Sequence, residues 1–203
     1  MQALLRLSRG IDWLNAQVGK YVIWLILAAT VISGLNAVVR KVFNTSSNAF
    51  LEVQWYLFAA SFLLAAGYTL LEKEHVKVDV INAKLRLRTR VWIDILGFAF
   101  FLTPMCWVVL YYSVPFFLQA FHSNEMSSNA GGLIRWPVYL MMPLGFGLLM
   151  LQGLSELIKR IAFLRGLIDD PTVKWVAMTP EEELAEVIRK TEEEAARNSA
   201  TRA

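Results

Sequence analysis

Four long stretches without charged side chains divide this chain, and they constrain its fold more than any other feature of the sequence. The first two cover residues 21–39 and 53–71, about the 20 apolar residues that an α-helix needs to cross a bilayer. The other two place spans at about 95–117 and 136–157. With 56% hydrophobic residues, the composition does not fit an ordinary soluble protein. The sequence therefore predicts an all-α integral membrane protein with four transmembrane helices, in a domain covering residues 21–160.

Prolines predict irregularities in the third and fourth spans. Pro104 and Pro115 lie in the third stretch, so we expect a kinked helix that leaves the membrane near Pro115. Pro137 suits the first turn of a helix. Pro143 predicts a bend, or a break in the hydrogen-bond ladder, about two turns further on.

The distribution of basic residues predicts the orientation in the membrane. Of the 20 Lys and Arg residues, 17 lie before the first span, between the second and third spans, or after the fourth. Basic residues concentrate on the cytoplasmic side of membrane proteins. We therefore expect both termini in the cytoplasm, which also explains the positive net charge without any nucleic-acid partner.

The two ends of the chain carry further helical patterns. Residues 1–20 predict an amphipathic helix that lies along the bilayer surface or against a partner, and both alternatives stay open here. Its apolar stripe consists of Leu4, Leu7, Ile11, Leu14 and Val18. Residues 161–203 form a predicted cytoplasmic tail, in which residues 180–197 read as a charged, mainly acidic helix.

Polar residues near the spans are the candidates for contacts. We interpret Glu52, Asp94 and Glu156 as boundary residues that reach water or headgroups. Glu52 shares a helix face with Tyr56, as Glu156 does with Gln152, and such faces suit a partner subunit. We expect hydrogen bonds between helices from four further side chains, which are Ser33, Asn36, Ser61 and Thr69.

The residues that catalysis, metals or cofactors require are scarce. Cys106 is the only cysteine, and the two histidines, His75 and His122, lie outside the predicted membrane core, where haem ligation would need them. Phosphate-binding lysine loops and serine nucleophile motifs are not found. We expect no catalytic residue, no metal site and no cofactor in this chain.

Three sequence patterns occur in order between the predicted spans. The first is E-V-Q-W-Y-L-F, beginning at Glu52, and the second is E-K-E-H-V-K-V-D, which contains His75 and Asp79. The third begins at Ser123 and reads S-N-E-M-S-S-N-A-G-G-L-I-R-W-P-V-Y-L-M-M-P-L-G-F. Together these patterns, within about residues 10–165, resemble the small membrane subunit, the DctQ-like component, of tripartite ATP-independent periplasmic (TRAP) transporters.

The resemblance implies a function and partners. A periplasmic, DctP-like binding protein captures an organic acid and delivers it to a membrane pair in the bacterial inner membrane. The large DctM-like subunit carries the substrate and sodium sites and moves as an elevator, while the small subunit braces it. By this resemblance we expect Glu52, His75 and Asp79 to hold the large subunit. Ser123, Glu125 and Arg135 would lie near the binding protein. A small 2-oxo or 2-hydroxy carboxylate is the expected substrate.

Two other readings stay open. The chain can be a stand-alone four-helix membrane protein that acts in assembly or anchoring through its cytoplasmic tail. The other is a quinone or haem oxidoreductase, which ranks third after the transporter subunit and the stand-alone protein because the sequence offers few ligands for either group.

Overall fold

The protein is helical in the part of the chain that the structure, a computed structural model, describes, which is residues 1–44, 47–73 and 86–168. The helices are α1 (Gln2–Phe43), α2 (Asn48–Leu71), α4 (Leu87–Gly97), a π-helical turn η1 (Phe98–Leu102), α5 (Thr103–Ser123) and α6 (Trp136–Leu164). Because α4, η1 and α5 are continuous, four helical segments are long and apolar enough to cross a membrane. This confirms the predicted four apolar helices. Their orientation across the bilayer stays a prediction, and the acidic helix at 180–197 lies outside the described residues.

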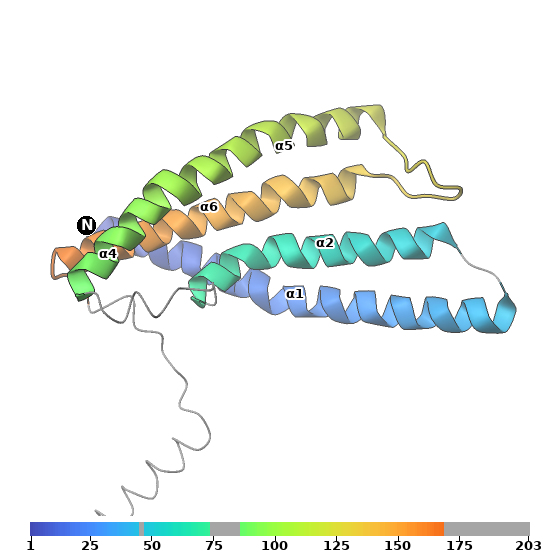
Figure 1. Cartoon of the computed structure of the whole chain (residues 1–203), viewed down its shortest axis with the longest axis horizontal. Helices are drawn as coiled ribbons and strands as arrows, with labels where there is room; N and C mark the ends of the chain where they lie inside the picture. The colour runs from blue at the N-terminus through green and yellow to red at the C-terminus, as the bar shows by residue number, and fades with distance from the viewer. Residues whose placement is uncertain (45–46, 74–85, 169–203) are drawn as a thin grey trace, which may run out of the picture. The chain divides into compact units, whose positions relative to one another are not determined.

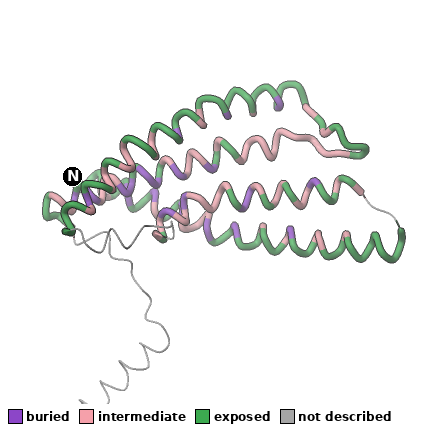
Figure 2. The backbone as a smooth tube through the Cα atoms, viewed as in Figure 1, coloured by how far each residue is buried: buried purple, intermediate pink, exposed green. Residues whose placement is uncertain are grey.

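The helices pack as neighbours in the order α1, α2, α6, α5 (Figure 1). The N-terminal part of α1 also contacts α6, so the first helix touches the last one. A small apolar core joins Leu70 of α2, Cys106 of α5 and Leu149 of α6. Figure 2 shows buried residues along the sides where helices meet and long exposed stretches elsewhere, as expected for helices that face lipid or a partner.

The first helix is longer than the sequence predicts. Separate elements are expected at residues 1–20 and 21–39, but α1 runs without a break from Gln2 to Phe43 and ends at Asn44 in the left-handed conformation. Gly19 lies at the predicted junction and does not interrupt the helix. A Cβ there would come within 2.3 Å of the Tyr68 ring, so glycine permits close packing of α1 on α2. Whether residues 1–20 lie on the membrane surface stays a prediction.

Pro104 and Pro115 act differently from one another. Since Pro104 has no N–H to donate, the backbone widens into η1, and both the N–H and the Oγ1 of Thr103 bond the carbonyl of Phe98. The irregularity expected in this segment is therefore present. α5 continues past Pro115 to Ser123 as a helix, and the point at which it leaves the membrane stays a prediction. α6 likewise continues past Pro143 without interruption, and Pro137 occupies its first turn as predicted.

Glycines set the distance between α2 and α6. A Cβ added at Gly145 would lie 2.6 Å from the backbone oxygen of Leu63, whereas one added at Gly147 would meet nothing within 4 Å. Gly145→Val is therefore expected to force the helices apart and to lower the free energy of unfolding by about 1–3 kcal/mol. Thermal unfolding in detergent measures this, with Gly147→Val as the matched control. Equal melting temperatures of the two variants would contradict the packing described here.

Candidate functional site

Three polar residues at the start of α2 hold the connection between α5 and α6. Asn48, Glu52 and Tyr56 are four residues apart, so they share one helix face. We call them the Glu52 clamp. The segment that they hold, residues 125–135, is folded as a short hairpin, which we call the 125–135 hairpin.

Glu52 makes the central contacts of this clamp. Its carboxylate accepts hydrogen bonds from the Ser127 hydroxyl, from Asn129 Nδ2 at 2.8 Å and from the Leu133 backbone N–H at 2.6 Å. The side chain is only 1% exposed. A buried carboxylate requires such donors to replace water, so this arrangement is stable only while the hairpin is folded.

Asn48 and Tyr56 bind the hairpin on either side of Glu52. Asn48 Nδ2 donates to the Ala130 carbonyl at 3.0 Å, and the Tyr56 hydroxyl donates to the Ile134 carbonyl at 3.2 Å. Both contacts are to backbone oxygens. The clamp therefore recognises the path of the hairpin backbone as well as its side chains.

The hairpin also has internal bonds. Met126 and Ile134 form an antiparallel bridge, and the Ser127 N–H donates to the Leu133 carbonyl at 2.9 Å. Gly131 at the turn has φ +70°, a conformation that glycine adopts without strain. These bonds fix the segment that the clamp holds.

Glu125 and Arg135 pair across the open end of the hairpin. Arg135 Nη1 lies 3.0 Å from Glu125 Oε1, with the side chains 31% and 39% exposed, respectively. Tyr139 donates to the same carboxylate oxygen at 3.4 Å. The hydrogen bond to Glu125 raises the pKa of Arg135. Both charges are accessible enough to meet a partner, although each already has one inside the chain.

The remaining residues predicted to face a partner lie apart from this cluster or outside the described residues. Ser123 is exposed at the end of α5, where its hydroxyl donates to the Ala120 carbonyl at 3.4 Å. His75 and Asp79 lie outside the described residues. The structure therefore brings together Glu52, Glu125 and Arg135 around one hairpin. That the six residues predicted to face a partner contribute to such an interface stays a prediction.

A second polar cluster ties α1, α4 and α6 together at the other end of the helices. Lys159 Nζ lies 2.9 Å from Asp12 Oδ2 and 2.6 Å from Glu156 Oε1. Next to it, Arg160 Nη1 pairs with Glu156 Oε2, and Arg160 Nε pairs with Asp94 Oδ2 at 3.0 Å. We call these five residues the ionic cluster. It joins three helices through charges that are largely removed from water.

Uncharged side chains extend the ionic cluster along α1 and α6. Ser155 Oγ lies 2.7 Å from Ser8 Oγ and 2.8 Å from Asp12 Oδ1. Gln152 donates to Asp12 Oδ1 at 2.9 Å and accepts from Asn15 Nδ2 at 3.0 Å. The N-terminal part of α1 is therefore fixed on α6 by a polar face, where the sequence predicts an apolar one.

The structure corrects several interpretations of single residues. Glu52 and Glu156 are each 1% exposed, so they do not reach water at a boundary, and the face of Gln152 and Glu156 meets the chain's own helices. Ser61 and Thr69 donate to carbonyls within α2, at Phe58 and Ala65, and within the described residues neither has a hydrogen bond to another helix. Asn36 Oδ1 has no hydrogen-bond partner among the described residues.

The sequence signal for the ionic cluster is the polar spacing on α6. Gln152, Ser155, Glu156 and Lys159 recur at three and four residues, which places them on one face of a helix that is otherwise apolar. Asp12 lies off the predicted apolar stripe of residues 1–20. What the sequence does not state is that these two features face one another.

Both clusters hold separate elements of the chain together through hydrogen bonds and ion pairs. Each acid of the ionic cluster, like Glu52, has donors within the chain. Within residues 1–44, 47–73 and 86–168, no group of three or more His, Cys, Asp or Glu side chains is placed to hold a metal ion. The fold and the clusters thus define a multi-pass helical membrane protein whose span ends are fixed by internal polar contacts.

The comparison with protein families identifies the chain more closely. The family model described as "Tripartite ATP-independent periplasmic transporters, DctQ component" matches residues 26–163, which is more than half of the chain. The chain therefore belongs to the DctQ family. It is a transport subunit and not an enzyme, and the family implies a TRAP complex with DctM and DctP partners. No curated protein and no solved structure matches the chain.

Proposed function

We propose that this chain is the static scaffold subunit of a sodium-driven TRAP transporter in the bacterial inner membrane. The transporter imports organic acids that a periplasmic binding protein delivers. The substrate and sodium sites belong to the large DctM-like subunit, which moves against this chain. Small 2-oxo or 2-hydroxy carboxylates are the proposed substrates.

The observation that carries this proposal is the pairing of buried charge within the chain. The Glu52 clamp and the ionic cluster lie at opposite ends of the helices, and each fixes elements that are far apart in sequence. A scaffold against which another subunit slides has to keep its own helices in place. Charged groups that are already paired are also poor binding sites for a transported carboxylate.

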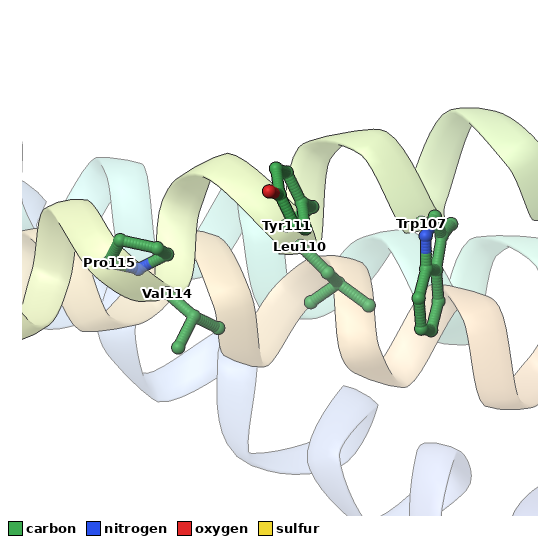
Figure 3. Close-up of a pocket in the computed structure, with 5 residues that line it drawn as sticks. All are labelled: Trp107, Leu110, Tyr111, Val114 and Pro115. Atoms are coloured by element: carbon green, nitrogen blue, oxygen red, sulfur yellow. The ribbon is translucent and has the colours of Figure 1, made fainter.

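Exposed apolar helix sides support the presence of a large partner as well as lipid. A groove of about 340 Å³ lies on α5, and Figure 3 shows that all its lining residues come from this helix. They are Trp107, Leu110, Tyr111, Val114 and Pro115. Such surfaces suit either acyl chains or the apolar helices of a second membrane subunit.

Co-purification tests the proposal. A tagged copy expressed with its native neighbouring genes, extracted in mild detergent, is expected to retain a large membrane subunit in stoichiometric amount. Mass spectrometry identifies what stays bound. Recovery of a lone 23.0 kDa species that is stable and functional would contradict the scaffold role and favour the stand-alone anchoring protein.

The 125–135 hairpin is the proposed surface for the binding protein. The double variant Glu125→Arg/Arg135→Glu keeps an ion pair but exchanges the positions of its positive and negative charges, which an incoming partner meets. Binding of the DctP-like protein to the purified membrane complex is expected to weaken, while the large subunit stays bound. Surface plasmon resonance measures this. Unchanged docking by the exchanged variant would remove the hairpin from the proposed interface.

A further inference from the structure

One face of η1 and α5 carries a line of exposed residues that includes both prolines of this segment. The line consists of Phe100, Pro104, Trp107, Tyr111 and Pro115, and we call it the proline face. Its members are three or four residues apart, so they lie on one side of the helix. The buried residues of α5, which are Cys106, Ser113 and Ala120, lie on the other side. Since α5 packs chiefly on α6 and forms one edge of the set of helices in Figure 1, the proline face is open.

The two prolines change the hydrogen bonding of the backbone on this face. A proline has no N–H for the carbonyl four residues earlier, which would accept it in a regular α-helix. Pro104 therefore leaves the carbonyl of Phe100 without its usual donor, and Pro115 does the same to the carbonyl of Tyr111. No side chain within residues 1–44, 47–73 and 86–168 donates a hydrogen bond to either carbonyl. Two backbone acceptors on the proline face thus lack the donor that a regular helix supplies.

Trp107 adds a donor without a partner between these two carbonyls. Its side chain is 62% exposed, and its indole N–H makes no hydrogen bond within the part of the chain that the structure describes. Tryptophan is enriched at the ends of membrane spans, where the N–H reaches headgroups and water. At 1.5 Å per residue, Trp107 instead lies about 18 Å and about 15 Å from the two ends of the predicted span at 95–117. That is near the centre of a hydrocarbon layer about 30 Å thick.

The two carbonyls lie within the same layer. Phe100 and Tyr111 are about 8 Å and about 9 Å inside the nearer ends of the predicted span. The groove of about 340 Å³ in Figure 3 is lined by Trp107, Tyr111 and Pro115 together with two aliphatic neighbours, so it offers an apolar recess beside the unpaired groups. The face therefore combines a recess with hydrogen-bonding groups at a depth where water does not supply partners.

We propose that the proline face is the docking site for one transmembrane helix of the large subunit, an inference that rests on the proposed function. Side chains of that helix donate to the carbonyls of Phe100 and Tyr111 and accept from the indole of Trp107. Acyl chains can fill an apolar groove, but they have no donor or acceptor, so lipid would leave all three groups unpaired. A second copy of this chain would bring one indole donor for two such carbonyls.

Photo-cross-linking locates the large subunit. Benzoylphenylalanine replaces Tyr111, which keeps the backbone carbonyl, or Phe62 as the control, in a tagged chain expressed with its native neighbouring genes. Phe62 is 73% exposed and lies near the middle of the second span, so it has a similar depth on another helix. Illumination of the membranes should join the large subunit to position 111 and not to position 62.

The other outcomes of this experiment separate the docking site from the proposed function. The docking site is wrong if a large subunit co-purifies but position 111 gives no protein adduct, an adduct with a second copy of this chain, or no higher yield than position 62. Each of these outcomes leaves the scaffold role standing. If no large subunit co-purifies with the wild type, both proposals are wrong.

Removal of the indole N–H tests the hydrogen bond itself. Trp107→Phe keeps an aromatic ring without the donor, and Trp24→Phe makes the same change at an exposed residue near the end of the first span. A hydrogen bond between membrane helices contributes about threefold in affinity, so the dissociation constant of the large subunit should rise about threefold in Trp107→Phe. It should not change in Trp24→Phe. Energy transfer between the two labelled subunits in detergent measures the constant. An unchanged constant in Trp107→Phe, or equal increases in the two variants, would contradict the proposal.

Discussion

Arg160→Ala is expected to lower the free energy of unfolding by about 3–5 kcal/mol, because it removes a buried guanidinium that pairs with two carboxylates at once. Arg160 is 1% exposed, and its guanidinium binds Glu156 and Asp94 while lying 4.6 Å from the centre of the Phe98 ring. Removing it breaks the ion pair between α4 and α6 and leaves the buried Glu156 with Lys159 as its cationic partner.

Thermal unfolding of the full complex in detergent measures this effect. Arg165→Ala is the matched control, because Arg165 is exposed and only five residues further on. Arg160→Lys should give a partial loss, since an ammonium group keeps the charge but cannot place two fixed donors on two carboxylates. If Arg160→Ala melts at the same temperature as Arg165→Ala, the ionic cluster does not stabilise the fold.

Glu52→Gln is expected to loosen the 125–135 hairpin and to reduce uptake. The substitution keeps the volume of the side chain but replaces one acceptor oxygen by an NH2 group. In place of the oxygen that accepts from the Leu133 N–H, that group would face a donor. In place of the other oxygen, it would require the Ser127 hydroxyl and the Asn129 amide to turn and offer acceptors. In either case the hairpin loses the charged acceptor that binds all three donors, so its anchor on α2 is weakened.

Hydrogen exchange at the Leu133 amide and transport into vesicles measure the two parts of this prediction. Glu72→Gln is the control, because it makes the same chemical change at the exposed end of the same helix. Full protection of the hairpin in Glu52→Gln would refute the clamp. Dissociation of the large subunit from a variant whose hairpin remains protected would instead show that Glu52 acts on the partner.

The residues that fasten each cluster are close in space and distant in sequence. The spacing of Asn48, Glu52 and Tyr56 predicts that they share one helix face, but it does not predict what they bind. Asn129 is 77 residues from Glu52 in the sequence, and Ala130 is 82 residues from Asn48. Asp12 and Lys159 are likewise far apart in the chain. Helical periodicity describes which side chains share a face, and it carries no information about which faces meet.

The sequence by itself determined the elements that depend on local composition. Four apolar stretches of membrane length, Pro137 in a first turn and the irregularity around Pro104 follow from hydropathy and from the missing proline N–H, which need no distant partner. The motifs that contain Glu52 and Arg135 likewise sufficed to indicate the DctQ family.

Only the tertiary structure decided how the polar groups are used. Glu52 and Glu156 look like hydrated boundary residues in the sequence, because a charge is cheapest near water. In the folded chain the hairpin and the neighbouring helices supply donors that replace water, so burial is permitted. Asp12 is likewise paired with Lys159 of α6. Burial of a charge depends on partners brought together by folding, and those partners are distant in the sequence.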